Sequence, residues 1–591
     1  MHEIKTARIR QRLSTELILL LLGSAIVFSQ ELLPQPPPPL RYRFNVLTPM
    51  RDGVRLAANL YLPEKEGKYP VILIRTPYGK GREQQDALYF AARGYAVLVQ
   101  DVRGRNDSDG EWYPWVNEGN DGYDTIEWAA KQPWSNGKVV TYGASYLGMD
   151  QWQAAGQDPP HLSAMVPIVA PADPYFGVFH PGGAFEYATM LTWNFINSRR
   201  TDLLPAIPLV KWPDVFRHLP ISETAAFSGN ETTYYHDWIE HNTRDAYWAK
   251  MSWSSAATKT HVPVFNVAGW FDIFHAGGLE NYRNLMQHSP PDVRNAHRLL
   301  VGPWAHGGPT QKLGDVDFGR AAAVDMRAKV VLWLDRYVKG EWNRADYDPP
   351  IELFFLGANE WRPEKSWPPP GVIAQRLYLR SQGNAAGQHG SGRLTANPPI
   401  SEPPDAYTFD PQNPVPTAGG ATCCDPRLVP WGPVNQNPVE TRSDVLVYTS
   451  EPLESDQTVA GDTEAHLFAS SSARDTDWSV RLVDVAPDGT ALKLTDGILR
   501  ARFRDSYEDP KLLEPGKVYE FVIRLAPIAA VFKKGHRIRV DVTSSDFPRY
   551  SRNTNTGGIP ELETRFQTAK QTIYHDRARS SYIVLPVLSY R

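Results

Sequence analysis

The first third of the chain alternates between short apolar runs and stretches with helical spacing. The apolar runs are bounded by Gly, Pro or Asp, as expected for parallel strands buried on both faces, and they are Val71–Arg75, Ala96–Asp101, Lys138–Tyr142 and Ala164–Val169. Helical patterns lie between them, as at Glu83–Arg93 and Tyr123–Lys131. The alternation predicts an open parallel sheet with helices on both faces.

This alternation stops over residues 171–260, where aromatic residues are frequent and no strand is evident. We predict a mostly helical insertion there. Strand patterns resume at Val262–Ala268 and Arg298–Gly302, and an amphipathic helix is predicted over Ala322–Val338. An insertion between strands of one sheet is well placed to act as a cap over a site at the strand ends.

Beyond about residue 350 the pattern changes to alternating runs separated by turn sequences, as at Trp478–Val485 and Arg537–Val542. Many short strands at this spacing predict an antiparallel sandwich or jelly roll. The predicted organisation is a signal peptide, an α/β domain in two parts, a helical cap and a C-terminal all-β jelly roll. These parts cover residues 1–29, 30–170 with 261–349, 171–260, and 350–591, respectively.

Composition narrows the possible partners. A chain of 591 residues exceeds the ~250–300 residues at which single cores stop growing, so several domains are expected. The formal net charge is −4, so there is no excess of basic residues to bind a phosphate backbone, and nucleic-acid binding is disfavoured. The two cysteines, Cys423 and Cys424, are neighbours and exclude a long-range disulfide framework. They form either a vicinal disulfide or two reduced thiols, and the sequence leaves both open.

The N-terminus has the pattern of a signal peptide. Basic residues precede a short apolar run, Leu17–Phe28, and Val27 and Ser29 provide small residues before a cut at Gln30. The run is shorter than the ~20 residues of a spanning helix. We therefore predict a secreted or periplasmic protein without stable membrane insertion after cleavage. An uncleaved membrane anchor is the alternative.

The most informative segment joins a predicted strand to a predicted helix at Gly143-Ala144-Ser145. Such a junction places a serine on a tight turn with its hydroxyl exposed above the sheet. The helix also directs its positive end and backbone N–H groups at the site, which suits a developing oxyanion. The usual motif is G-x-S-x-G, whereas Leu147 occupies the fifth position here and Gly148 follows it. Alone, the segment fits an ordinary strand-to-helix turn equally well.

A nucleophilic serine needs a base, and the base needs an orienting acid. In this fold the acid and then the histidine follow the serine, each just after a later strand. Asp272 follows the strand ending near Ala268, and His306 follows the next strand. We therefore predict Ser145, Asp272 and His306 as a catalytic triad. The competing candidates are Asp237 and Asp315 for the acid, and His261 and His275 for the base.

The oxyanion requires at least two donors. One is expected to be the backbone N–H of Tyr146, the residue after the nucleophile. The loop after an early strand, which normally supplies the other, has no Gly-rich run and contains Tyr78. The phenolic O–H of Tyr78 is therefore the predicted second donor, and a packed aromatic beside a proline is the alternative. No cofactor and no metal are expected, since the triad needs neither and no HExxH motif occurs.

Together, these motifs resemble the cocaine esterase-like branch of the X-Pro dipeptidyl-peptidase family, the CocE/NonD hydrolases. The resemblance rests on Arg75–Tyr78, Asp101–Gly104, Gly143–Gly148, Gly269–Asp272, Gly302–His306, Trp333–Gly340, Asp444–Tyr448, Asp475–Trp478 and Thr495–Arg500. It implies an α/β-hydrolase domain with an inserted helical cap and a C-terminal jelly roll. It also assigns the triad to Ser145, Asp272 and His306, and the oxyanion donors to Tyr78 and the Tyr146 amide.

The substrate is predicted only by class. Family members that hydrolyse α-amino esters hold the ammonium with acidic residues, two of which follow the triad aspartate, but Ile273-Phe274-His275 occupies those positions here. We expect an ester or amide of a small molecule whose acyl group carries no α-ammonium. The alternatives are an X-Pro dipeptidyl peptidase and a non-catalytic protein that binds carbohydrate at the cell surface. The oligomeric state stays open.

Overall fold

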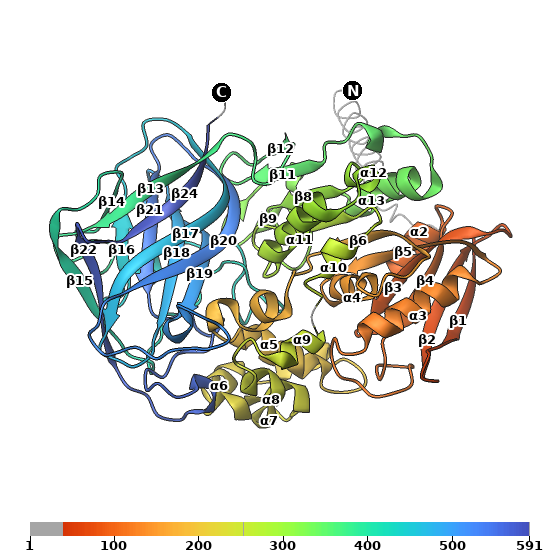
Figure 1. Ribbon diagram of the computed structural model, residues 1–591, viewed down its shortest axis with the longest axis horizontal. Coiled ribbons are helices and arrows are strands. Elements are labelled where there is room, and N and C mark those ends of the chain that lie inside the picture. The colour runs from red at the N-terminus through yellow and green to blue at the C-terminus, as the bar shows by residue number, and fades with distance from the viewer. Residues whose placement is uncertain (1–38, 252, 590–591) are drawn as a thin grey trace, which may run out of the picture.

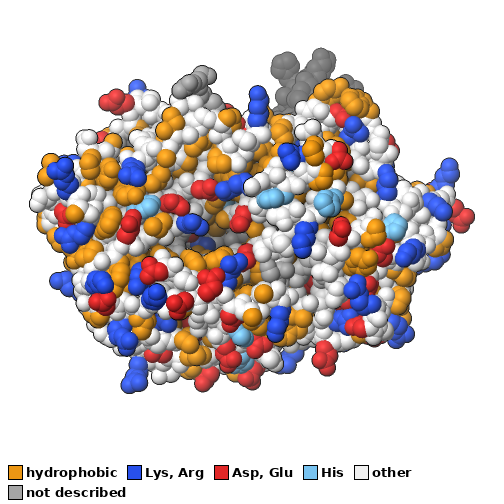
Figure 2. All heavy atoms as spheres, in the orientation of Figure 1, with side chains coloured by type: hydrophobic (Ala, Val, Ile, Leu, Met, Phe, Trp, Pro, Cys, Tyr) orange, Lys and Arg blue, Asp and Glu red, His pale blue; other side chains and the backbone are white. Residues whose placement is uncertain are grey.

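The computed structural model describes residues 39–251 and 253–589. In Figure 1 an α/β half lies on the right, an all-β half lies on the left, and the helices labelled α5 to α9 pack below and between them. The predicted signal peptide, residues 1–29, lies outside the described residues. Figure 2 shows acidic and basic side chains intermixed over the visible face, in keeping with the small net charge.

A ten-stranded mixed sheet forms the centre of the α/β half. It runs parallel from β4 to β11, and β1, β2 and β12 add antiparallel edges. In order across the sheet, the strands are β1 (Leu40–Pro49), β2 (Arg55–Pro63), β4 (Ala96–Asp101), β3 (Tyr69–Thr76), β5 (Ser135–Ala144), β6 (Leu162–Ile168), β7 (Phe265–Gly269), β8 (Arg298–Gly302), β11 (Ile351–Phe355) and β12 (Glu360–Glu364).

This sheet differs from the predicted one at its edges. The prediction of a parallel sheet holds for the centre. At the edges, β1–β2 and β11–β12 are antiparallel hairpins, because a short turn can join only antiparallel neighbours. The sheet also continues past residue 350, where the sequence pattern predicts the second domain. Ile351 pairs with Leu299 of β8, and local hydrophobic periodicity does not reveal a pairing between strands so far apart in the chain.

Helices cover both faces of the central strands. They are α2 (Gln84–Ala91), α3 (Glu118–Ala130), α4 (Tyr146–Ala155), α11 (His275–His288), α12 (Pro291–Arg294) and α13 (Met326–Leu334). The helix predicted over Ala322–Val338 begins later, because the Asp325 side chain accepts a hydrogen bond from the Ala328 N–H (3.1 Å) and caps α13. The α-helical hydrogen-bonding pattern then changes at Asp335, where a short, wider turn begins.

The segment between β6 and β7 is helical, as its lack of strand pattern predicts. It contains α5 (Tyr187–Asn197), α6 (Trp212–Arg217), α7 (Thr224–Phe227), α8 (Thr233–Glu240), α9 (Ala246–Met251) and α10 (Ala256–Lys259). Its aromatic side chains are mostly core: Trp193, Phe195, Trp212, Phe216, Tyr235, Trp238, Trp248 and Trp253 are all buried. Close backbone approach joins it to the all-β half, since a Cβ on Gly182 would lie 1.8 Å from the carbonyl oxygen of Ile498.

The C-terminal half is all β, which confirms the predicted class. Its twelve strands are β13 (Val372–Arg380), β14 (Arg393–Thr395), β15 (Ser401–Phe409), β16 (Leu446–Thr449), β17 (Gln457–Ser471), β18 (Asp477–Val485), β19 (Ala491–Arg500), β20 (Tyr519–Phe532), β21 (Arg537–Thr543), β22 (Ala569–Asp576), β23 (Arg579–Ser580) and β24 (Tyr582–Leu588). The one described α-helix beyond α13 is the short α14 (Asn437–Glu440). A two-stranded ribbon, β9 (Lys312–Leu313) with β10 (Val316–Asp317), lies outside both sheets.

The two halves share one buried apolar cluster. Leu299 and Phe354 of the first sheet pack in the same cluster as Leu467 and Ile523 of the all-β half. Burial of apolar surface stabilises the folded protein by roughly 25 cal/mol per Å². The shared core therefore holds the two halves in a fixed relation. Loops of one half can therefore contribute defined side chains to a site in the other.

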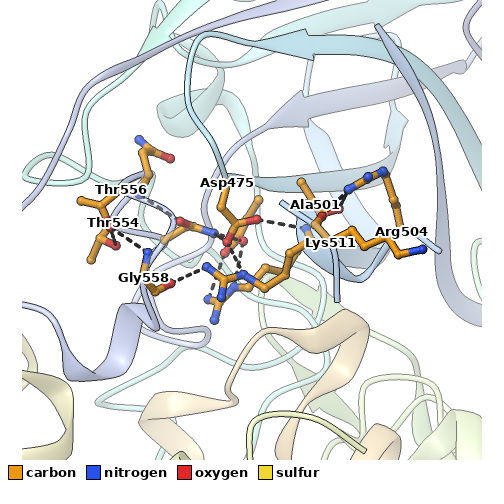
Figure 3. Close-up of polar contacts among 12 residues, drawn as sticks. Asp475, Ala501, Arg504, Lys511, Thr554, Thr556 and Gly558 are labelled. Atoms are coloured by element: carbon orange, nitrogen blue, oxygen red, sulfur yellow. Dashed lines mark hydrogen bonds and ion pairs between the residues drawn. The ribbon is translucent and has the colours of Figure 1, made fainter. Parts of the chain in front are cut away.

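Buried ion pairs hold the loops of the all-β half that face the helical segment. Figure 3 shows the Asp475 carboxylate, which accepts hydrogen bonds from the backbone N–H and Nε of Arg502 (3.0 and 2.8 Å). Asn553 donates to the same carboxylate (2.9 Å), and Arg502 also reaches the Gly558 carbonyl. The charges of Asp475 and Arg502 are thus paired with each other and hydrogen-bonded, as burial of charge requires. Asp475, from the Asp475–Trp478 segment that contributes to the family resemblance, therefore orders these loops.

Candidate active site

Ser145 occupies a strained turn between β5 and α4. Its backbone dihedrals are φ 63° and ψ −123°, a combination that costs a non-glycine residue roughly 1–3 kcal/mol. The Ser145 N–H donates to the carbonyl of Ile168 on the neighbouring strand β6 (2.9 Å). The parallel sheet thereby holds the turn, and the hydroxyl lies at the carboxyl end of the central strands.

The glycines around Ser145 explain the departure from the usual motif. Leu147 packs directly over Gly143, where a Cβ would come within 2.4 Å of the Leu147 Cβ. Gly148 packs against β6 instead, because a Cβ there would lie 3.1 Å from the Ile168 carbonyl oxygen and 2.9 Å from the Ala170 Cβ. The close approach of helix and strand thus falls on Gly148, one residue later than the motif expects.

The structure brings the three predicted triad residues into one hydrogen-bonded chain. His306 Nε2 lies 2.8 Å from Ser145 Oγ, and His306 Nδ1 lies 2.7 Å from Asp272 Oδ2. The second carboxylate oxygen, Oδ1, accepts from the Phe274 N–H (2.7 Å). Because an ionised carboxylate only accepts, Nδ1 carries the proton and Nε2 is left free to accept from the serine hydroxyl.

The loops that carry Asp272 and His306 are tied to each other. Trp270 N donates to Gly302 O (2.8 Å), and Phe271 N donates to Trp304 O (3.0 Å). Both loops begin with a glycine for steric reasons: a Cβ on Gly269 would lie 2.4 Å from the Trp304 carbonyl oxygen, and one on Gly302 would lie 2.2 Å from the Trp304 ring. Packing around one tryptophan therefore sets the spacing between acid and base.

The competing candidates lie elsewhere. Asp237 and Asp315 accept hydrogen bonds from a tyrosine hydroxyl and a backbone amide, respectively. The buried His275 ring lies against two backbone carbonyls, and His261 is exposed. No described contact brings any of the four to Ser145.

The pH dependence of activity is expected to follow His306. Burial lowers the pKa of His306, but the charge and hydrogen bond of Asp272 outweigh it, so the pKa lies above its ordinary value of 6.5. To act as the predicted base His306 must be neutral, and it becomes protonated as the pH falls through this raised pKa. The value of kcat/KM for a neutral ester should therefore fall on the acid side with a midpoint above 6.5, measured from about pH 5 to about pH 8. A midpoint below 6.5 would contradict this assignment.

Tyr78 is placed as an oxyanion donor requires. Its oxygen accepts a hydrogen bond from Trp193 Nε1 (3.0 Å), which leaves its own O–H free to donate. Burial raises the pKa of Tyr78, whereas the hydrogen bond from Trp193 lowers it, with a raised pKa as the net result, and the Ser145 hydroxyl lies within hydrogen-bonding reach of the phenol. The phenol therefore stays protonated at neutral pH and lies within reach of the nucleophile.

The backbone amide of Tyr146 is the second predicted donor. Tyr146 is the first residue of α4, so its N–H has no helical acceptor four residues earlier. Its side chain is fixed, since its hydroxyl donates to Glu118 (2.7 Å) and accepts from the Trp115 N–H (3.1 Å). Glu118 pairs in turn with the buried Arg75 (2.8 Å). No sequence motif points to Glu118, which lies at the start of α3.

Removing the Tyr78 hydroxyl tests its part in oxyanion stabilisation. Tyr78→Phe keeps the ring and removes one donor, which is expected to lower kcat by about 10²–10³-fold with a smaller effect on KM. The matched control is Tyr407→Phe, which removes a buried hydroxyl bonded to Ser544 (2.8 Å) in the all-β half. Steady-state kinetics on one ester compare the two, and equal rates for both variants would exclude Tyr78 as the donor.

A small, mostly apolar cavity opens beside Ser145. Besides Ser145 and Tyr146, its walls include Trp115, Met149, Val178, Thr189, Met190, Trp193, Phe274, Cys423 and Cys424. The cysteines come from a loop of the all-β half, and both are free. The sequence does not reveal this placement, because only the packing of the two halves carries that loop to the site.

The described residues offer no group of three or more His, Cys, Asp or Glu side chains that could hold a metal ion. Within 39–251 and 253–589, no helix has the length and apolar character needed to cross a membrane.

Comparisons with known proteins agree with this architecture. The sequence model of the X-Pro dipeptidyl-peptidase S15 family matches residues 52–308, and that of the X-Pro dipeptidyl-peptidase C-terminal non-catalytic domain matches residues 343–584. The chain is 36% identical over 570 residues to a cocaine esterase of Rhodococcus sp. (strain MB1 Bresler), which covers 92% of this chain and 98% of the relative.

Solved structures agree over nearly the whole length. An α-amino acid ester hydrolase superposes with a TM-score of 0.82 at 27% identity, covering 95% of this chain and 99% of the other. An aminopeptidase of a Thaumarchaeota archaeon gives the same TM-score, identity and coverage.

Proposed function

The chain belongs to the X-Pro dipeptidyl-peptidase S15 family as a CocE/NonD-type serine hydrolase of ester or amide bonds, and we propose that Ser145, His306 and Asp272 are its catalytic triad. The observation that carries the proposal is the continuous hydrogen-bonded chain from the strained Ser145 through His306 to the buried Asp272. A serine hydroxyl becomes an effective nucleophile in this arrangement.

The geometry supports an acyl-enzyme mechanism. Ser145 Oγ attacks the acyl carbon while its proton passes to His306 Nε2, and Asp272 stabilises the resulting imidazolium. The Tyr78 hydroxyl and the Tyr146 amide donate to the oxyanion. His306 then protonates the leaving group, which leaves Ser145 acylated. Water, activated by His306 in the same way, releases the acid.

We propose that the acyl group is uncharged and apolar or aromatic. The walls of the cavity beside Ser145 carry no carboxylate among the described residues, and apolar residues follow Asp272 directly. Glu186 bonds the pocket-lining Thr189 (3.3 Å), but its carboxylate also faces the buried Arg549 (3.5 Å). Burial raises the pKa of Glu186 to about 7 against the opposing charge of Arg549, so this carboxylate is a weak counter-charge for a substrate ammonium.

A matched pair of esters tests the acyl preference. Phenylacetyl and phenylglycyl esters of one alcohol differ by the α-amino group alone. An unpaired ammonium in an apolar pocket costs several kcal/mol, so kcat/KM is expected to favour the phenylacetyl ester by at least about 100-fold. An Ala-Pro anilide in the same panel tests the peptidase alternative. Preference for the phenylglycyl ester or for Ala-Pro release would overturn the proposed acyl class.

We also propose that residues 1–29 are a cleaved signal peptide and that the enzyme is secreted or periplasmic. The basic residues, the short apolar run and the small residues before Gln30 support this. N-terminal sequencing of the mature protein tests it, with Gln30 as the expected first residue.

A further inference from the structure

A loop of the all-β half delivers two thiols to the cavity beside Ser145. Cys423 and Cys424 lie between β15 and α14 and both line this cavity. They are the only cysteines of the chain, and both are free. The proposed mechanism uses neither thiol. Two adjacent cysteines in the cavity beside Ser145, which we call the acyl pocket, are therefore a separate feature of the site.

The loop that carries the thiols is firmly held. Gly420 and Gly432 exchange two backbone hydrogen bonds (2.7 and 2.9 Å) that close its base. A Cβ on Gly419 would lie 2.4 Å from the Gly432 carbonyl oxygen, so the two sides of the loop approach closely. Nearer the tip, Thr422 Oγ1 donates to the Pro430 carbonyl (3.0 Å). The position of the cysteines is therefore set by the packed frame of the protein.

The two thiols differ in environment and interact with each other. Cys423 is 7% exposed, whereas Cys424 is partly exposed and adopts φ 80°, the left-handed region that is costly for a non-glycine residue. Burial, followed by the thiol–thiol contact with Cys424, raises the pKa of Cys423 well above its ordinary value. Cys423 thus stays a protonated thiol, and Cys424 is the more accessible partner.

Adjacent cysteines are poorly suited to a direct disulfide. Their Cα atoms lie ~3.8 Å apart across a trans peptide bond, whereas disulfides usually join Cα atoms about 4.4–6.8 Å apart. A vicinal disulfide is therefore strained and readily reduced. An atom that bonds both sulfurs closes a larger ring and does not require the sulfurs to reach bonding distance of each other.

We propose that Cys423 and Cys424 form a dithiol site for trivalent organoarsenicals inside the acyl pocket. The arsenic of an arylarsine oxide forms one bond to each sulfur, and its oxygen leaves as water with the two thiol protons. No electron is transferred, so no oxidant is needed. Cys424 reacts first because it is more exposed, and Cys423 then closes the ring.

Occupancy of this site blocks the proposed reaction. The aryl group on arsenic lies in the cavity that the acyl group of an ester must enter, beside Trp193 and Phe274. Aromatic rings and sulfur make favourable contacts, so the aryl group is expected to pack against the apolar walls. This consequence rests on the proposed function of Ser145, whereas the dithiol site itself does not.

Phenylarsine oxide tests the proposal on the full-length enzyme. One equivalent is expected to add one phenylarsenic group to the intact mass, with loss of water, and to abolish ester hydrolysis. Ethanedithiol should reverse both effects, whereas an excess of a monothiol should not. Cys424→Ser and Cys423→Ser should each lose the bridged adduct and keep, after treatment, the rate each shows untreated.

The outcomes separate the site from the mechanism. Wild-type enzyme without a stoichiometric adduct, or with an adduct that a monothiol removes, would overturn the dithiol site whether or not the serine variants fold. Ser145→Ala should still form the adduct. If it does while the wild-type adduct leaves hydrolysis unchanged, the dithiol site stands and the assignment of this cavity as the acyl pocket fails.

Discussion

Replacing Ser145 by alanine is expected to lower kcat by about 10⁶-fold, because the chain from Asp272 through His306 then ends without a nucleophile. KM should change far less, since the alanine keeps the backbone and the cavity walls. A fluorophosphonate probe should label the wild-type protein and leave the variant unlabelled. Rates with an aryl ester, measured at high enzyme concentration, quantify the loss.

The matched control for this variant lies on the neighbouring strand. Ser163 of β6 donates to the His161 carbonyl (3.2 Å), so Ser163→Ala removes a serine hydroxyl from the same sheet without touching the site. It should keep wild-type rates within a small factor. Undiminished hydrolysis by Ser145→Ala would refute the acyl-enzyme mechanism. Failure of the wild-type protein to label would favour a non-catalytic binding protein.

Replacing Asp272 by asparagine is expected to lower kcat by about 10⁴-fold. The Phe274 N–H needs an acceptor and would keep the amide oxygen of the new side chain, which turns its NH₂ toward His306 Nδ1. A donor at that place favours the tautomer with the proton on Nε2, which cannot accept the Ser145 proton. Loss of charge also removes what raises the pKa of His306, so the acid limb of the residual rate should move to lower pH.

Asp315→Asn is the control for this second variant. Asp315 was a competing candidate for the acid, is exposed, and accepts from the Asn435 N–H (2.9 Å) away from the site. Its kinetics should match those of the wild-type enzyme. If Asp315→Asn reduced the rate as strongly as Asp272→Asn, the loss of rate could not be assigned to the contact between Asp272 and His306.

Much of the fold could be predicted because buried parallel strands leave a local signal. The central strands read as continuous apolar runs, since helices cover both faces of the sheet. The antiparallel hairpins at the edges could not be predicted in the same way. β11 belongs to the first sheet through its pairing with β8, and such pairing depends on residues far apart in the chain.

The candidate site, like the fold, was predictable from the sequence only in part. The sequence by itself was enough to predict Ser145, Asp272 and His306 and their order, because each follows a strand and the carboxyl ends of parallel strands meet at one edge of the sheet. The tertiary structure alone decided which contacts these groups make and what surrounds them. The Cys423–Cys424 pair reaches the acyl pocket only because the two halves share a core, and no local pattern records a contact made by packing between distant segments.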